Sequence, residues 1–257
     1  MPTKLLKIFD DRIKSGAIQP DDAQRSAVAK LNELTIRLRA WKLPVSGFLG
    51  RLFTSKQEAP RGLYIHGKVG RGKTMLMDLF HDSVKFEPKW RVHFHAFMAE
   101  VHDRIGKARA RDEGDPIVPV AKELAAKARL LCFDEFHVTD IADAMILGRL
   151  FKAMFEEGIV VVATSNVPPD GLYRNGLNRQ LFLPFIALIE ERMEVMELAS
   201  AKDFRLEKLA GERLYFTPAN DTSLTSLRRI FHRLTGAEHG KPRSVEVKGR
   251  QLVLNEV

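Results

Sequence analysis

Cysteine is almost absent from this 257-residue sequence, in which Cys132 is the single example. A disulfide framework is therefore excluded, and a protein of the reducing cytoplasm is expected. Cys132 lies within an apolar run, which predicts a small core residue rather than a reactive thiol. Long apolar runs are lacking too, because none reaches the roughly 18 residues that cross a bilayer. No secretory signal is expected, since the start Met1–Lys4 is not followed by a continuous apolar core.

Acidic residues are fewer than basic ones, with 33 Asp and Glu against 41 Lys and Arg, and the net charge is +8. This excess permits an acidic partner such as nucleic acid, an anionic membrane surface for peripheral association, or an acidic protein. The basic residues are scattered and accompany no recognised nucleic-acid-binding motif. With 45% hydrophobic and 29% charged residues, the composition is that of a globular protein with a sizeable core. Composition alone leaves the partner open.

The most informative stretch is glycine-rich: Gly67–Thr74 reads G-K-V-G-R-G-K-T. It fits the G-x-x-x-x-G-K-T pattern of the nucleotide-binding P-loop. The apolar and aromatic segment Leu63–His66 precedes it as a predicted strand, and Thr74–Phe80 follows with the apolar spacing of a helix. Strand, loop and helix in this order direct backbone N–H groups at a polyphosphate. The residues expected to contact ATP are Gly67, Lys68, Val69, Gly70, Arg71, Gly72, Lys73, Thr74 and Met75.

Individual side chains have predicted roles in this site. Lys73 is expected to reach the β- and γ-phosphates of ATP, and the Thr74 hydroxyl to bind Mg²⁺. The second part of the site is predicted in Arg129–Glu135, an apolar strand that ends in two acids. Asp134 would hold the hydration shell of Mg²⁺, and Glu135 would position or deprotonate the attacking water. The alternative is that the two acids form a solvated turn.

A third apolar strand, Ile159–Ala163, is followed by small polar residues that end with Asn166. If this strand neighbours the one that ends at Asp134, Asn166 lies beside that carboxylate. An amide in this place can orient the attacking water against the γ-phosphate. The alternative is an asparagine turn before a proline pair.

The rest of the chain alternates predicted strands and helices. The expected helices are Lys4–Ala17, one from Asp21 or Asp22 to Trp41, Met98–Ala108, Val118–Ala128, Asp140–Glu157, and a broken helix at Leu172–Leu188. Two further strands are expected, at Arg91–His95 and Met193–Leu198. Five strands separated by helices indicate an α/β fold with a doubly wound parallel sheet between helices. The predicted divisions are an N-terminal helical arm with a connector at 1–60, a P-loop core at 61–200 and a C-terminal segment at 201–257.

The C-terminal segment is predicted to be small and of α+β type. A strand is expected at Arg213–Phe216, a helix at Leu224–Leu234, and a hairpin of Ser244–Val247 with Gln251–Leu254 that turns at Lys248 and Gly249. Because the chain stops almost directly after this last strand, the segment is expected to be incomplete.

Several segments resemble the AFG1-like ATPases, a branch of the AAA+ P-loop NTPases that includes bacterial cell-division proteins and mitochondrial relatives. The matching segments are Arg61–Asp78, Val92–Met98, Leu131–Met145, Thr164–Ile186 and Asp203–Arg205, and together with the N-terminal helices they cover most of the chain. Two departures limit the resemblance. Phe204 stands where Tyr is expected, and family members run on through a further C-terminal segment with the rest of a helical lid.

The resemblance implies an ATPase that forms a homo-oligomeric ring and remodels proteins. In the bacterial branch it implies a role in cell division through destabilisation of FtsZ polymers, and its mitochondrial relatives imply protein quality control. The alternative class is a nucleic-acid-associated AAA+ ATPase of helicase-loader type, which the basic balance permits. Asn166 would be the sensor-1 residue. Arg179 would stabilise the γ-phosphoryl group in the next subunit's site, with Arg174 as the second candidate.

Two features around the second predicted strand leave alternatives open. His93 and His95 share one face of that strand. A zinc site there would need a third and a fourth ligand, for which His102 is the only near candidate, so zinc is the less favoured interpretation. Phe97 and Met98 follow the strand. They are either core residues or, as in ring-forming AAA+ proteins, residues that face a central pore.

Overall fold

The computed structural model describes residues 4–41, 58–110, 114–200 and 215–235. Nearer the C-terminus it describes residues 237–238, 240, 242–247 and 250–254. The chain forms two compact units, Met1–Asp203 and Phe204–Val257. None of the helices in these described ranges is long and apolar enough to cross a membrane.

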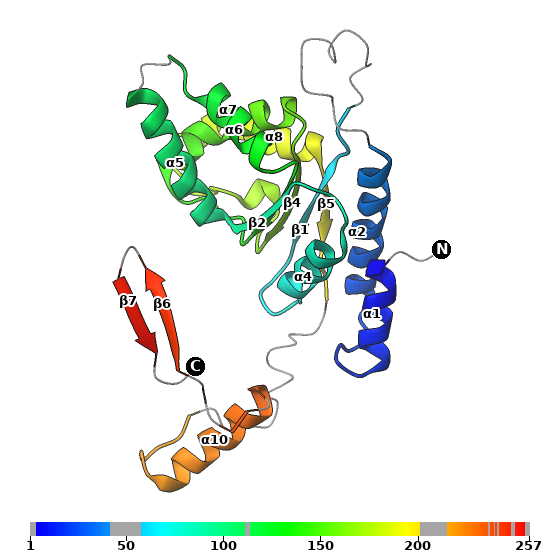
Figure 1. Ribbon diagram of the computed structural model, residues 1–257, viewed down its shortest axis with the longest axis vertical. Coiled ribbons are helices and arrows are strands. Elements are labelled where there is room, and N and C mark those ends of the chain that lie inside the picture. Colours follow the sequence, from blue (N-terminus) through cyan, green and yellow to red (C-terminus); the bar gives the residue numbers. More distant parts are fainter. Residues whose placement is uncertain are drawn as a thin grey trace. The chain divides into compact units, whose positions relative to one another are not determined.

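The first unit is built on a five-stranded sheet (Figure 1). Its strands are β1 (Gly62–His66), β2 (Lys89–His93), β3 (Leu130–Asp134), β4 (Val160–Ser165) and β5 (Met193–Glu197). They lie in the order β2-β3-β4-β1-β5, and every neighbouring pair is parallel. The expected five-stranded parallel sheet is confirmed. Because all strands run the same way, their carboxyl ends meet at one edge of the sheet.

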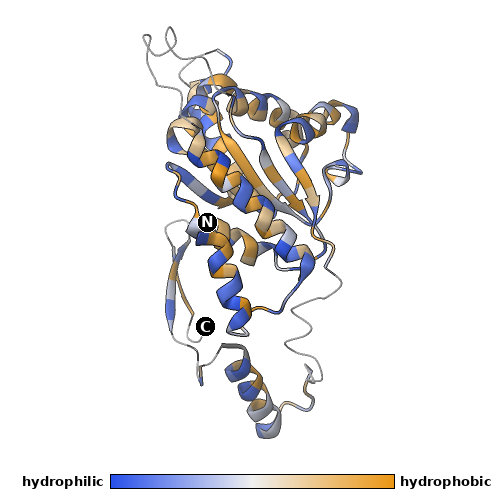
Figure 2. Ribbon diagram, turned by 90° about the vertical axis from the view of Figure 1, so that its right-hand side faces the viewer, coloured by the Kyte–Doolittle hydropathy of each residue, from blue (hydrophilic) through white to orange (hydrophobic). Residues whose placement is uncertain are grey.

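Helices cover both faces of this sheet. One face carries α1 (Lys4–Lys14), α2 (Asp22–Ala40) and α4 (Lys73–Ser83), and the other carries α5 (Phe94–Ala110), α6 (Ile117–Lys127), α7 (Ile141–Glu156) and α8 (Leu183–Arg192). Side chains alternate along each strand and divide the core in two. In β3, Leu131 and Phe133 pack on the side of α5, and Leu130 and Cys132 on the side of α2. Figure 2 shows these apolar strands beside helices that carry both hydrophilic and hydrophobic residues.

Cys132 is a buried free cysteine in the centre of β3. Burial raises the pKa of its thiol to about 12. The thiol therefore stays protonated near neutral pH and is a poor nucleophile. The expectation of an inert core cysteine is confirmed.

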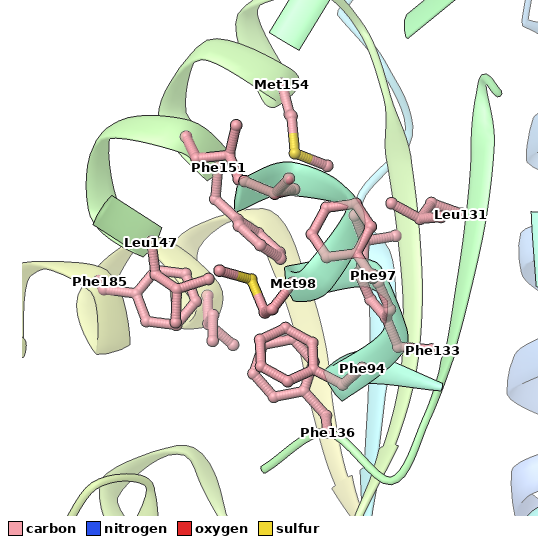
Figure 3. Packing of buried hydrophobic residues seen from close by; sticks show 14 of the residues in the cluster. Phe94, Phe97, Met98, Leu131, Phe133, Phe136, Leu147, Phe151, Met154 and Phe185 are labelled. Atoms are coloured by element: carbon pink, nitrogen blue, oxygen red, sulfur yellow. The ribbon is translucent and has the colours of Figure 1, made fainter. Parts of the chain in front are cut away.

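An aromatic cluster fills the core between the sheet and α5 (Figure 3). The ring centroids of Phe97 and Phe133 are 4.7 Å apart, and those of Phe94 and Phe136 are 4.1 Å apart. Phe97 is 0% exposed and Met98 is 2% exposed. Both are therefore core residues, and the pore-facing alternative is wrong.

The second strand and the helix after it differ from their predicted bounds. The predicted strand is Arg91–His95, but β2 ends at His93 and α5 begins at Phe94. His93 and His95 thus belong to different elements, and the prediction that they share a strand face is wrong. The change comes directly at Phe94, which is buried in the aromatic cluster. Within the described ranges, no group of three or more His, Cys, Asp or Glu side chains could hold a metal ion.

The prediction of a broken helix at Leu172–Leu188 is largely wrong. Two short 3₁₀ turns, η1 (Pro169–Gly171) and η2 (Arg179–Leu181), come before α8. Tyr173 and Asn178 have φ angles of 51° and 58°, which a right-handed helix cannot contain. The helix therefore starts only after these residues, and it continues beyond the predicted end.

Local signals located other helix starts correctly. The carboxylate of Asp140 accepts hydrogen bonds from the amides of Ala142 and Asp143 at the start of α7. Asp21 caps α2 in the same way through the amide of Gln24. A capping carboxylate satisfies N–H groups that have no partner inside the helix.

The second unit contains α10 (Asp221–Thr235) and an antiparallel hairpin of β6 (Arg243–Val247) and β7 (Arg250–Leu254). The predicted helix and hairpin are confirmed. A strand is predicted at Arg213–Phe216. Tyr215 and Phe216 belong to no strand, so the prediction is wrong for these two residues. The other positions of that strand lie outside the described residues, as do Lys248, Gly249 and Asp203–Arg205.

Candidate functional site

The glycine-rich loop lies at the carboxyl edge of the sheet, between β1 and α4 (Figure 1). The amide of Gly67 donates to the carbonyl oxygen of Ser165, the last residue of β4, at 3.2 Å. On the other side, the amide of Leu198 after β5 donates to the carbonyl oxygen of His66 at 2.6 Å. The loop is thus joined to the ends of both strands that flank β1. Open α/β sheets bind ligands at this edge.

The loop adopts a conformation that needs its glycines. Gly70 and Gly72 have φ angles of 81° and 90°, which L side chains rarely adopt. Gly72 directly precedes α4, so the free N–H groups of the first helical turn open towards the loop. The Nζ of Lys73 donates to the carbonyl oxygens of Gly67 and Lys68 at 2.5 and 2.9 Å. Its ammonium therefore lies against the backbone of the loop itself.

Gln24 of α2 supports the loop and was missed by the sequence analysis. Its side chain is buried, and Nε2 donates to the carbonyl oxygen of Arg71 at 3.0 Å. The start of α2 is also tied to the chain after β5, because the hydroxyl of Ser200 donates to Asp21 at 2.7 Å. No short motif could have shown the loop contact, since Gln24 and Arg71 are 47 positions apart.

Asp134, the predicted magnesium-binding acid, ends β3 and is 5% exposed. Its Oδ2 accepts a hydrogen bond from Nε of Arg91 at 2.6 Å, and Nη1 of the same arginine donates to Asp78 of α4. Burial disfavours the charge on Arg91, but the hydrogen bonds to Asp134 and Asp78 outweigh burial and raise its pKa. Arg91 and Asp78 were not singled out in the sequence, because no motif marks them.

The remaining oxygen of Asp134 suits a magnesium ion. Oδ1 is buried and has no hydrogen-bond partner among the described residues. A buried carboxylate oxygen without a partner is costly unless a donor or a cation meets it, and Mg²⁺ prefers oxygen ligands. Thr74, the other predicted ligand, is exposed in the first turn of α4. The residues present therefore fit the ion.

Glu135 follows directly and has a φ angle of 54°. Hydrogen bonds of its neighbours hold the backbone there: the amide of Phe136 donates to the carbonyl oxygen of Thr164 at 2.7 Å, and the Ser165 hydroxyl donates to the carbonyl oxygen of Phe136 at 2.8 Å. A left-handed residue other than glycine persists only where its surroundings hold it. The Glu135 side chain is left exposed to solvent.

Asn166 comes directly after β4 and is exposed. The strand β4 lies between β3 and β1, with Ala163 opposite Phe133 and Ser165 opposite His66. The neighbouring strands that the predicted role requires are therefore present. Asn166 follows the strand between the one that leads into the P-loop and the one that ends in Asp134.

Arg179 lies in η2, and its guanidinium is held by its own chain. Nη1 donates to the carbonyl oxygen of Leu172 at 2.8 Å, and Nη2 to that of Asp170 at 2.6 Å. Its partners are thus backbone groups rather than an acidic side chain. Arg174, the second candidate, is exposed and makes no hydrogen bond or ion pair with the described residues.

The AFG1-like ATPase family model matches residues 3–257. The chain belongs to this family. The AFG1-like chain is 40% identical over 250 residues to the cell division protein ZapE of Escherichia coli (strain K12), covering 93% of this chain and 66% of that protein. It is 45% identical over 215 residues to lactation elevated protein 1 homolog B of Danio rerio, covering 79% of this chain and 42% of that protein. It thus spans just under two thirds of the bacterial relative's length.

Solved structures that are similar in part include DnaI and AMPPCP-bound DnaA from Aquifex aeolicus. The comparison with DnaI has a TM-score of 0.49 and 13% identity, and covers 72% of this chain and 86% of that chain. The comparison with DnaA has a TM-score of 0.49 and 14% identity, and covers 85% of this chain and 64% of that chain.

Proposed function

We propose that this AFG1-like chain binds ATP together with Mg²⁺ and hydrolyses it. One observation carries the proposal. Three adjacent strands, β3, β4 and β1, place the parts of the site at one edge of the sheet. Asp134, with its unpartnered Oδ1, ends β3; Asn166 follows β4; and the P-loop follows β1. When bound, Mg²⁺ would neutralise charge on the β- and γ-phosphate oxygens.

Each residue then has a distinct part in the reaction. Lys73 exchanges its hydrogen bonds to two loop carbonyl groups for bonds to the β- and γ-phosphates. Thr74 and Asp134 would hold the metal, which supplies positive charge beside the phosphates. Glu135 accepts a hydrogen bond from the attacking water and takes its proton, and Asn166 orients the same water.

Two variants separate binding from hydrolysis. Lys73→Ala is expected to abolish binding of a fluorescent ATP analogue, because the loop loses its ammonium. Glu135→Gln is expected to bind ATP normally and to lose turnover by about 100-fold or more, since the carboxylate acts only on the water. Lys152→Ala, at an exposed position of α7, is the matched surface control. Unchanged affinity in Lys73→Ala or normal turnover in Glu135→Gln would show that the assignment is wrong.

We infer further that hydrolysis drives the remodelling of a protein partner in cell division. The support is the 40% identity to a relative that is named as a cell division protein. Polymers of FtsZ are the leading candidate substrate. The test compares the mass of sedimented FtsZ polymers with ATP and wild-type chain, and with ATP and Glu135→Gln. Equal polymer mass under both conditions, with ATPase activity present, would remove FtsZ as the substrate and leave the ATPase assignment intact.

The net charge of +8 permits a second candidate, an ATPase that acts on nucleic acid. Its mark would be DNA binding whose affinity falls steeply with salt, because phosphate contacts release counterions. Binding to short single-stranded and double-stranded DNA is measured over a salt series. Absence of binding at low salt would remove this candidate.

A further inference from the structure

A chain of three charged residues links the P-loop helix to the acidic end of β3. Asp78 of α4 pairs with Nη1 of Arg91, and Nε of Arg91 pairs with Asp134 at 2.6 Å. Arg91 comes from β2, where it lies opposite Cys132 of β3. The side chains of Arg91 and Asp134 are only 22% and 7% exposed. The pair is therefore screened by salt much less than a surface pair would be.

The position of Asp78 connects these three charged residues to the P-loop. Asp78 comes four residues after Thr74 in α4, which places both on one face of the helix, one turn apart. Arg91 thus ties the helix face that carries one predicted magnesium ligand to the side chain of the other, Asp134.

Arg91 also decides which oxygen of Asp134 is available. Its Nε donates a hydrogen bond to Oδ2, while Oδ1 stays buried without a partner among the described residues. The guanidinium is planar and donates in fixed directions, so it restricts the rotation of the carboxylate as well as neutralising charge. Two carboxylates face one guanidinium in this cluster, which leaves one negative charge for a cation.

We propose that Arg91 is a positioning residue for the magnesium-bound nucleotide. It holds Asp134 and the Thr74 face of α4 in the arrangement that the metal requires, and it acts through them without touching the phosphates. This inference rests on the proposed function, the binding of Mg²⁺ and ATP at the loop. Binding of nucleotide without metal depends on the loop backbone and Lys73, and is therefore independent of Arg91.

The test measures the affinity of a fluorescent ADP analogue for the 257-residue chain, first with EDTA and then at increasing free Mg²⁺. Arg91→Met is expected to leave the affinity in EDTA unchanged. It is expected to raise the Mg²⁺ concentration at which half of the metal-dependent change in ADP-analogue affinity has occurred. The expected rise in this concentration is about 10- to 100-fold, the usual effect of removing the partner of a metal ligand. Asp78→Ala, which keeps the bond between Arg91 and Asp134, should give a smaller shift. Arg91→Lys keeps the charge but loses the planar fork, and should give an intermediate shift.

The controls make each outcome decisive. An unchanged Mg²⁺ requirement in Arg91→Met, with a raised one in Asp134→Ala, would overturn the role of Arg91. Loss of affinity in EDTA would overturn it too, because Arg91 would then support the loop itself. If Arg91→Met does not fold, an unchanged Mg²⁺ requirement in Arg91→Lys overturns the proposal. If wild type binds no better than Lys73→Ala under any condition, the proposed function fails as well.

Discussion

At the scale of single residues, backbone conformation decides which glycines of the chain can be replaced. Gly72 has a φ angle of 90°, and a Cβ there would lie 2.7 Å from Nε2 of Gln24. Gly106 lies inside α5 with open space where a Cβ would be. The two glycines therefore allow one substitution to be compared in opposite settings.

We predict that Gly72→Ala lowers the free energy of unfolding by about 1–2 kcal/mol, because a left-handed conformation is strained for alanine. We predict that Gly106→Ala raises it by about 0.5–1 kcal/mol, because alanine loses less backbone freedom in a helix. Urea denaturation measures both changes. A shift of both midpoints in one direction would contradict the conformational argument.

At the scale of elements, aromatic rings attach α5 to the sheet. The ring of Phe97 lies 4.7 Å from that of Phe133 and 5.9 Å from that of Trp90, measured between centroids. None of these residues belongs to the P-loop, so packing and nucleotide binding can be separated here.

We predict that Phe97→Ala lowers the free energy of unfolding by about 3–5 kcal/mol, as expected for emptying a buried ring site. The folded variant should keep its affinity for the ATP analogue. The exposed His95 on the same helix supplies the control, because His95→Ala should change stability by less than about 0.5 kcal/mol. Denaturation curves and nucleotide titrations measure the two effects. A small loss of stability in Phe97→Ala would fit a ring exposed in a pore and would contradict its burial.

At the scale of the whole molecule, the ring that the family resemblance implies would let one subunit complete the site of the next. Arg179 is our candidate for the arginine that acts across this interface, and such an arginine is worth about 10³- to 10⁵-fold in turnover. In its own chain, this arginine holds the carbonyl oxygens of Leu172 and Asp170.

We predict that Arg179→Ala is inactive alone and regains turnover when mixed with Lys73→Ala. The first variant keeps an intact P-loop, and the second supplies the arginine. Native mass spectrometry establishes that mixed assemblies form, and phosphate release measures the turnover. Arg174→Ala, at the exposed second candidate, is the matched variant. Mixed assemblies without regained turnover would show that Arg179 acts only within its own loop.

The sequence by itself determined the parts of the site that are continuous in the chain. Gly67–Thr74 was recognisable because a strand, a glycine-rich turn and a helix follow one another, and each has a short-range pattern. The strand that ends in Asp134 and the helix predicted to start at Asp140 were predictable for the same reason. Prediction failed around Tyr173 and Asn178, whose positive φ angles accompany turns in the folded chain that helical periodicity does not reveal.

Only the tertiary structure decided what surrounds these parts. The strand order β2-β3-β4-β1-β5 brings Asn166 between the P-loop strand and the strand of Asp134. It also places Arg91 against a carboxylate 43 positions away, and the packing of α2 brings Gln24 to the loop. The physical reason is that these contacts join elements distant in the chain. Their formation depends on how whole faces of helices and strands pack, which no local pattern of residues encodes.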